Sequence, residues 1–259
     1  MIKKLLILFA AAGTLSACDM FKKDNYEAPN AQLHGRILDK ATGDLVETDI
    51  HEGSIYRWQE LGDEWTTGWN ERVIMQSGEY RDNQMFSGRY KFEFLNANFF
   101  PFSKDEVVIG KGDNEIDWEV TPYIRVKNVQ IAKDDAAKVI RATFSLEAGD
   151  PQVRLNKVRL YCSTDIYVGE PFTTFNTGGE GFQIGFTDDP ETEVDETVID
   201  PAKVYTLTID LTNDYNKDYF KFSRNYFFRV GAKAANIAGM GTVRSNYAPY
   251  TVINFSTAQ

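Results

Sequence analysis

The sequence predicts an all-β protein built from two tandem β-sandwich domains. Three observations favour strands over helices. Aromatic residues make up 14% of the chain, many short segments alternate apolar and polar residues, and clusters of turn-forming residues separate these segments. Aromatic side chains are enriched in strands, and alternation with a period of two is typical of strands that bury one face. We therefore expect two cores enclosed by short strands.

The first domain is expected to span residues 31–121. Alternation begins at residues 33–38, is followed by the turn-rich segment 39–44, and returns at residues 90–94 and 116–120. The domain boundary is predicted at Thr121-Pro122, because proline lacks the amide hydrogen that strand pairing needs.

The second domain is expected to span residues 122–259. Its alternating segments lie at residues 124–126, 140–146, 158–160, 205–211, 226–232 and 250–255. Several short strands between turn clusters predict a second sandwich. Cys162 continues the alternation of Val158 and Leu160, so we expect it in a half-buried strand, where an unpaired cysteine behaves as a small hydrophobic residue.

Residues 35–43, with the sequence Gly-Arg-Ile-Leu-Asp-Lys-Ala-Thr-Gly, resemble the opening of prealbumin-like domains, also called carboxypeptidase-regulatory-like domains. Gly78-Glu79-Tyr80 and residues 88–92 are similar to the later turn and strand of that family. The resemblance implies that residues 31–121 form a prealbumin-like sandwich. The chain departs from the family by a long aromatic insert between Ile55 and Asn70.

The segment 226–232, followed by Asn236 and Gly239, resembles the late strands and loop of fibronectin type III domains. The resemblance implies an immunoglobulin or fibronectin III-like second domain. This domain has no tryptophan, since the last one in the chain is Trp118, and in this interpretation Phe144 fills the core position.

The N-terminus predicts export and a lipid anchor. Lys3 and Lys4 precede an apolar run at residues 5–12, which is shorter than the roughly 20 residues that span a bilayer. Leu15-Ser16-Ala17-Cys18 then resembles the lipobox of bacterial lipoproteins. The resemblance implies a signal peptide at residues 1–17, lipid on Cys18 and a polar tether at residues 18–30.

With a lipobox, a prealbumin-like domain and a fibronectin-like domain, the chain resembles a family of two-domain Bacteroidota lipoproteins from polysaccharide-utilisation loci. This implies a lipid-anchored protein of the outer membrane, exposed at the cell surface. Its implied partners are a polysaccharide or oligosaccharide, an outer-membrane transporter and the transporter's glycan-binding lipoprotein.

Charge and motifs exclude several functions. Removal of residues 1–17 removes two lysines and takes the formal net charge from −10 to −12, which disfavours nucleic acid because phosphates need cationic partners. His34 and His51 are the two histidines, and no metalloprotease, nucleophile-elbow or phosphate-loop motif occurs. We expect no catalytic residues and no cofactor.

Two acidic segments are candidate metal sites. Asp214, Asn216 and Asp218 match the first half of a calcium loop, but Tyr219 stands where glycine is needed. We therefore predict a strand-connecting loop there, a solvated loop at residues 188–196, and no metal.

The candidate binding residues are Trp58, Trp65 and Trp69, with Tyr56 nearby. Three of the four tryptophans fall within twelve residues, among glycine and threonine residues typical of a loop. An exposed indole can stack on the apolar face of a sugar ring. The alternative is that these rings cover the open edge of the first sandwich or the joint between domains.

The preferred function is a non-catalytic lipoprotein that binds or handles glycans in polysaccharide utilisation. The alternative is a structural spacer or protein-interaction subunit of an outer-membrane transport complex, and an enzyme is disfavoured. An exposed tryptophan platform would favour the first, a broad apolar patch the second, and a deep pocket with converging carboxylates the third.

Overall fold

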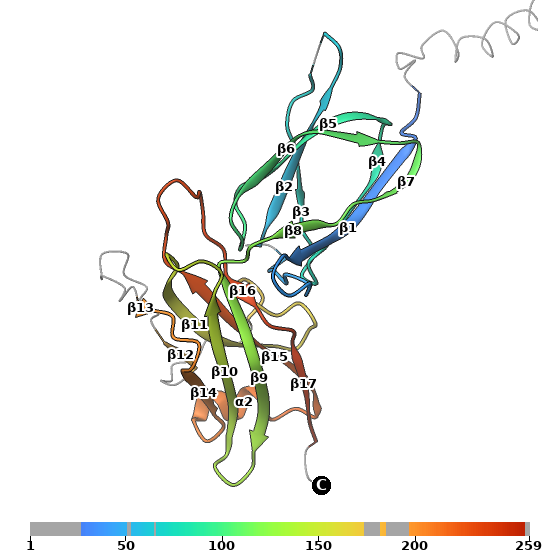
Figure 1. Ribbon diagram of the computed structural model, residues 1–259. Coiled ribbons are helices and arrows are strands. Elements are labelled where there is room, and N and C mark those ends of the chain that lie inside the picture. Colours follow the sequence, from blue (N-terminus) through green and yellow to red (C-terminus); the bar gives the residue numbers. More distant parts are fainter. Residues whose placement is uncertain (1–26, 51–52, 65, 174–181, 185–196, 257–259) are drawn as a thin grey trace, which may run out of the picture.

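A computed structural model of the chain describes residues 27–50, 53–64, 66–173, 182–184 and 197–256. Over these residues the chain forms two β-sandwiches and one short helix (Figure 1), which confirms the predicted all-β class with tandem sandwiches. The predicted signal peptide, Cys18 and residues 18–26 of the tether lie outside this part. Within it, no helix has the length and apolar character needed to cross a membrane.

The first sandwich has two sheets. One sheet contains β1 (Ala31–Asp39), β4 (Glu79–Met85), β7 (Gly112–Glu115) and β8 (Trp118–Val120). In it, β1 runs antiparallel to β4 and parallel to β7 and β8. The other sheet is antiparallel and has the order β3 (Asn70–Val73), β2 (Ile55–Leu61), β5 (Gly88–Phe94) and β6 (Phe102–Ile109).

The core of the first sandwich follows from the alternation in its strands. In β1, every second residue is buried, and Leu33 and Ile37 are fully buried. They share a core with Phe92 and Phe94 of β5 and with other aromatic rings of the facing sheet. The rings of Phe94 and Phe102 stack with their centroids 4.4 Å apart. Aromatic residues therefore fill most of this core.

Gly35 in β1 lets the backbone pass very close to the segment between β7 and β8. A Cβ atom at Gly35 would lie 1.8 Å from the carbonyl oxygen of Ile116. The hydroxyl of Tyr80 donates a hydrogen bond of 2.5 Å to the same oxygen. The close approach therefore requires glycine at this strand position.

The second sandwich also has two sheets, of the immunoglobulin-like kind. One has the order β14 (Val204–Asp210), β10 (Val139–Ala148) and β9 (Ile124–Asp134). The other contains β11 (Arg154–Ser163), β12 (Gln183–Ile184), β13 (Thr197–Val198), β15 (Arg224–Ala234), β16 (Asn246–Tyr247) and β17 (Thr251–Phe255). The helix α2 (Asp214–Tyr219) connects β14 to β15.

The core of the second sandwich confirms two predictions. Phe144 is buried and stacks on Tyr205, with ring centroids 5.5 Å apart, so it is part of this core. Cys162 lies in β11 as a free, fully buried thiol, and burial raises its pKa well above the ordinary value.

A short segment of chain connects the two cores. The first core ends at Val120 and the second begins at Tyr123. Between them, the amide of Phe100 donates a 3.0 Å hydrogen bond to the carbonyl oxygen of Thr121. Only Thr121 and Pro122 separate the cores along the chain. The side chain of Asn246 in β16 donates a 2.8 Å hydrogen bond to the carbonyl oxygen of Asn98, so the two sandwiches lie in direct contact (Figure 1).

Candidate functional site

The outer face of the sheet β3–β2–β5–β6 carries paired charged side chains. Arg57 of β2 lies opposite Glu93 of β5 in the register, and its Nη2 is 2.6 Å from Glu93 Oε2. Lys91 Nζ lies 3.3 Å from Glu93 Oε1 and 3.4 Å from Asp105 Oδ1. Opposite charges therefore alternate across the strands and hold one another in place.

The pairing keeps these groups charged. Burial alone would raise the pKa of Glu93, but hydrogen bonds from Arg57 and Lys91 hold it below its ordinary value. Hydrogen bonds to Glu93 and Asp105 raise the pKa of Lys91. The face thus offers both donors and acceptors, without an excess of positive charge among these four residues.

Trp69 lies on this face, directly before β3. Its side chain is 37% exposed. The guanidinium carbon of Arg57 is 4.3 Å from the centre of the indole ring, and Lys91 Nζ is 6.0 Å from it. A cation at this distance from an aromatic face is attracted to it, so Arg57 supports the indole while the ring remains accessible to solvent.

The connection that leads to Trp69 is tied to β2 by Thr67. The amide of Thr67 donates to the carbonyl oxygen of Glu60 at 3.1 Å, and its hydroxyl oxygen accepts from the amide of Glu60 at 2.9 Å. Gln59 Nε2 donates to the carbonyl oxygen of Thr67 at 2.6 Å. These bonds hold the chain just before Trp69 against β2, which places Trp69 on the outer face of the sheet.

The structure corrects the expectation that Tyr56 and Trp58 share an exposed loop with Trp69. Both lie in β2 and are 1% and 7% exposed. Trp58 Nε1 donates to Asp82 Oδ2 at 3.2 Å, and burial raises the pKa of Tyr56. They point inward because they alternate with Arg57 along the strand. Trp65 lies outside the described residues.

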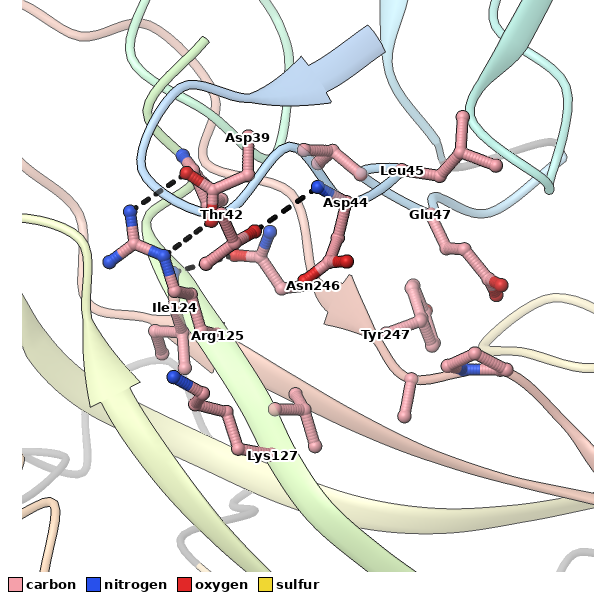
Figure 2. A pocket seen from close by; sticks show the side chains of 15 residues that line it. Asp39, Thr42, Asp44, Leu45, Glu47, Ile124, Arg125, Lys127, Asn246 and Tyr247 are labelled. Atoms are coloured by element: carbon pink, nitrogen blue, oxygen red, sulfur yellow. Dashed lines mark hydrogen bonds and ion pairs between the residues drawn. The ribbon is translucent and has the colours of Figure 1, made fainter. Parts of the chain in front are cut away.

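A cavity of about 410 Å³ lies at the junction of the two domains. The turn after β1 lines one side, and β9 and β16 line the other. Figure 2 shows Asp39 and Arg125 joined by hydrogen bonds at one side of it. Burial alone would raise the pKa of Asp39, but hydrogen bonds from Arg125 and the amide of Ala41, with the charge of Arg125, hold it below its ordinary value.

Beside this cavity, the fully buried guanidinium of Arg229 joins the domains. Its Nη1 donates to the carbonyl oxygen of Thr48 at 2.9 Å, and its Nη2 lies 2.7 Å from Glu47 Oε2. Its Nε donates to the carbonyl oxygen of Ala248 at 2.9 Å, and its centre lies 4.3 Å from the ring of Tyr247. Burial raises the pKa of Glu47, and the charge of Arg229 opposes that rise.

Sequence reasoning did not find this junction as a functional feature. Arg229 lies in the segment that resembles a fibronectin strand, but its partners Glu47 and Thr48 belong to the other domain. The one signal in the sequence is that Arg229 is a charged residue within an apolar stretch of its strand. This signal suggests a buried charge but does not identify its partner.

The described residues contain no group of side chains arranged to hold a metal ion. Asp214, Asn216 and Asp218 lie in α2, so the predicted connecting loop is a helix. Asn213 caps it by accepting a hydrogen bond of 2.9 Å from the amide of Tyr215. His34 Nδ1 is 3.2 Å from Asp113 Oδ1, while His51 and residues 188–196 lie outside the described part.

Comparison with known proteins places the chain in a family. Residues 124–243 match the family DUF3823_C, a domain of unknown function. A solved protein named "putative carbohydrate binding protein", from Bacteroides uniformis ATCC 8492, is 40% identical, with a TM-score of 0.78 over 87% of this chain and 99% of that one. The chain belongs to the same family as this Bacteroides uniformis protein. The DUF3823_C match covers the second sandwich from β9 to the segment before β16.

More distant members share the fold. DUF3823 family proteins from Parabacteroides merdae ATCC 43184 and Bacteroides ovatus ATCC 8483 are 19% and 20% identical, with TM-scores of 0.65 and 0.64. They cover 89% and 88% of this chain, and all of their own length is matched. No curated protein matches the chain.

Proposed function

We propose that this protein is a non-catalytic carbohydrate-binding lipoprotein of the outer-membrane surface. The observation that carries the proposal is the exposed indole of Trp69, supported by Arg57 on a face of paired donors and acceptors. The family relative from Bacteroides uniformis, which is named for carbohydrate binding and is 40% identical, supports the same class of ligand.

The chemistry of the face suits a sugar ring. The apolar C–H face of a pyranose would stack on Trp69, and its hydroxyl groups would donate to Asp105 and accept from Lys91. Stacking on one aromatic ring contributes about 1 kcal/mol beyond burial of area. A single ring of this kind gives weak binding, which suits repeated contacts along a polymer.

The shape of the face favours an internal segment of a chain. The hollow beside Arg57 and Glu93 has a volume of only about 30 Å³, so it cannot enclose a sugar. A polysaccharide would lie across the sheet, with both ends of the bound segment continuing into solvent.

Trp69→Ala tests this site. We expect affinity for a bound polysaccharide, measured by affinity electrophoresis on the chain from residue 19 onward, to fall roughly tenfold, or about 1.4 kcal/mol. Trp69→Tyr should retain part of the affinity, because a ring remains. Phe222→Ala is the matched control, since Phe222 is 53% exposed and also lies beside two cations, Lys221 and Arg224.

The melting temperature of each variant is also measured. It should stay close to that of the unaltered chain, because an exposed ring contributes little to the core. Binding by Trp69→Ala equal to that of the unaltered chain would reject this face. Equal losses in the Trp69 and Phe222 variants would show a general effect of surface aromatic residues instead.

The anchor is proposed to be lipid on Cys18, on the basis of Leu15-Ser16-Ala17 before it. Multiple acyl chains give stable membrane attachment. Cys18→Ala should abolish labelling by radioactive fatty acid. It should also release the protein from the membrane or block removal of the signal peptide. Persistent labelling of this variant would refute lipidation at Cys18.

A second candidate function is a rigid spacer or accessory subunit of an outer-membrane transporter and its glycan-binding lipoprotein. The buried contact between Arg229 and Glu47 favours it, because it fixes one domain against the other. The two functions are separated by growth on the polysaccharide. A strain carrying Trp69→Ala should grow normally if the protein is only a spacer and poorly if Trp69 binds the glycan.

A further inference from the structure

We propose that the cavity at the domain junction is a second carbohydrate site, which takes one neutral sugar residue or the end of a short oligosaccharide. It goes beyond the Trp69 face, because none of the residues that line the cavity belongs to that face. The proposal rests on the size, the rigidity and the charge of the cavity.

The size of the cavity suits a small molecule. Its volume of about 410 Å³ falls within the roughly 300–1,000 Å³ of small-molecule pockets, which often occur between domains. The Trp69 face offers no comparable hollow. The cavity therefore suits a ligand that lies between the two domains with one side open to solvent, such as a terminal sugar.

The walls are held by bonds that cross the junction. Arg125 Nη2 donates to Asp39 Oδ1 at 2.9 Å. Asn246 Nδ2 donates across the junction to the carbonyl oxygen of Asn98 at 2.8 Å. Within the second domain, Asn246 Oδ1 accepts from the amide of Ile124 at 3.0 Å, which holds the Asn246 side chain in place. Because these partners are already fixed, a ligand would not have to order the walls, and the ordering entropy lost on binding is reduced.

The charges exclude an acidic ligand. Arg125 is paired with Asp39, and Lys127 Nζ lies 2.9 Å from Glu147 Oε2. Glu47 is paired with Arg229 on the other side of the cavity. The cations that line the cavity are therefore neutralised, and no excess positive charge remains to hold a carboxylate or sulfate group.

Asp44 supplies the free acceptor. Its carboxylate makes no hydrogen bond or ion pair with the described residues, and Figure 2 shows it within the group of lining side chains. Leu45, which is 42% exposed, lies beside it, and Val126 and Pro249 add further apolar surface. An acceptor next to an apolar wall matches a sugar, which presents hydroxyl donors and an apolar C–H face.

The experiment uses the chain from residue 19 onward, with both domains present and with the methyl groups and amide nitrogens isotopically labelled. Glucose, galactose, mannose and xylose are added in turn, and nuclear magnetic resonance shifts are followed. At least one sugar should shift the methyl signals of Leu45 and Val126 and the side-chain amide of Asn246. Asp44→Ala should weaken that binding about tenfold, since a hydrogen bond to a charged group is lost.

Three variants make the result specific. Leu45→Trp should block the cavity and abolish the shifts, while Asp135→Ala, an exposed acid in the turn after β9, should leave them unchanged. Trp69→Ala should also leave them unchanged, so failure at this cavity is distinguishable from failure of the Trp69 face. Melting temperatures close to that of the unaltered chain confirm that the variants fold.

Several results would overturn the proposal. These are an absence of shifts at the cavity with all four sugars, binding that survives both Asp44→Ala and Leu45→Trp, and binding that disappears with Trp69→Ala. Stronger binding of glucosamine than of every neutral sugar would also overturn it, because Asp44 would then select an ammonium group.

Discussion

At the residue scale, Arg229 shows how a buried charge can join two domains. Arginine is almost never fully buried unless it is paired, and Arg229 is 0% exposed. Glu47, Thr48 and Gln76 of the first domain accept its hydrogen bonds, as do Val168 and Ala248 of the second. Its removal would leave these acceptors buried without their donor.

Arg229→Ala is therefore expected to lower the free energy of unfolding by about 3–5 kcal/mol, the range for breaking a buried ion pair. Arg224→Ala on the same strand is the control, because Arg224 is exposed, and it should change stability by no more than about 0.5 kcal/mol. Chemical denaturation of both variants measures the difference. Similar stabilities would mean that the Arg229 contacts do not contribute to folding.

At the element scale, β1 organises the first sandwich. It pairs with β4 on one side and with β7 and β8 on the other. The close contact between Gly35 and Ile116 lies at the change from β7 to β8. A side chain here would push apart strands on which the whole sheet depends.

Gly35→Ala should destabilise the protein by about 1–3 kcal/mol, as expected for overpacking, because the Cβ atom meets backbone rather than a flexible side chain. Gly68→Ala is the matched change, since no atom lies within 4 Å of its added Cβ. Thermal denaturation of the two variants compares them. If the Gly35→Ala and Gly68→Ala variants have the same melting temperature, the strand shifts to make room for the side chain and the prediction is wrong.

The helix α2 shows the limit of local motifs. Asp214, Asn216 and Asp218 have the spacing of a calcium loop, yet they follow Asn213, whose side chain caps a helix. Asparagine is among the preferred N-cap residues, so this signal was present in the sequence. The capping interaction and the burial of Asn216 favour a short helix over an open loop.

At the scale of the whole molecule, the junction couples two cores that are otherwise separate. The first core ends at Val120 and the second begins at Tyr123. Beyond the Arg229 contacts, the hydroxyl of Tyr247 donates to Asp49 Oδ2 at 2.7 Å across the junction. Polar contacts of this kind lose their partners when the domains are separated.

Residues 31–121 and 122–259, expressed separately, should each give a β-rich circular dichroism spectrum and a cooperative unfolding transition. Each should melt at a lower temperature than the intact chain, because Arg229 and Tyr247 lose Glu47 and Asp49. Substantial helix, or the absence of a transition in either half, would show that the domains depend on each other to fold. Melting temperatures equal to that of the intact chain would show that the junction adds no stability.

The sequence by itself determined the all-β class, most strand positions and the buried places of Phe144 and Cys162, because alternation along a strand is a local property. Only the tertiary structure decided that Tyr56 and Trp58 point into the core while Trp69 faces solvent, since this depends on which side of the sheet packs. It also decided the pairing of Arg229 with Glu47, which are 182 positions apart. No local pattern specifies that contact, because it forms only when one folded domain packs against the other.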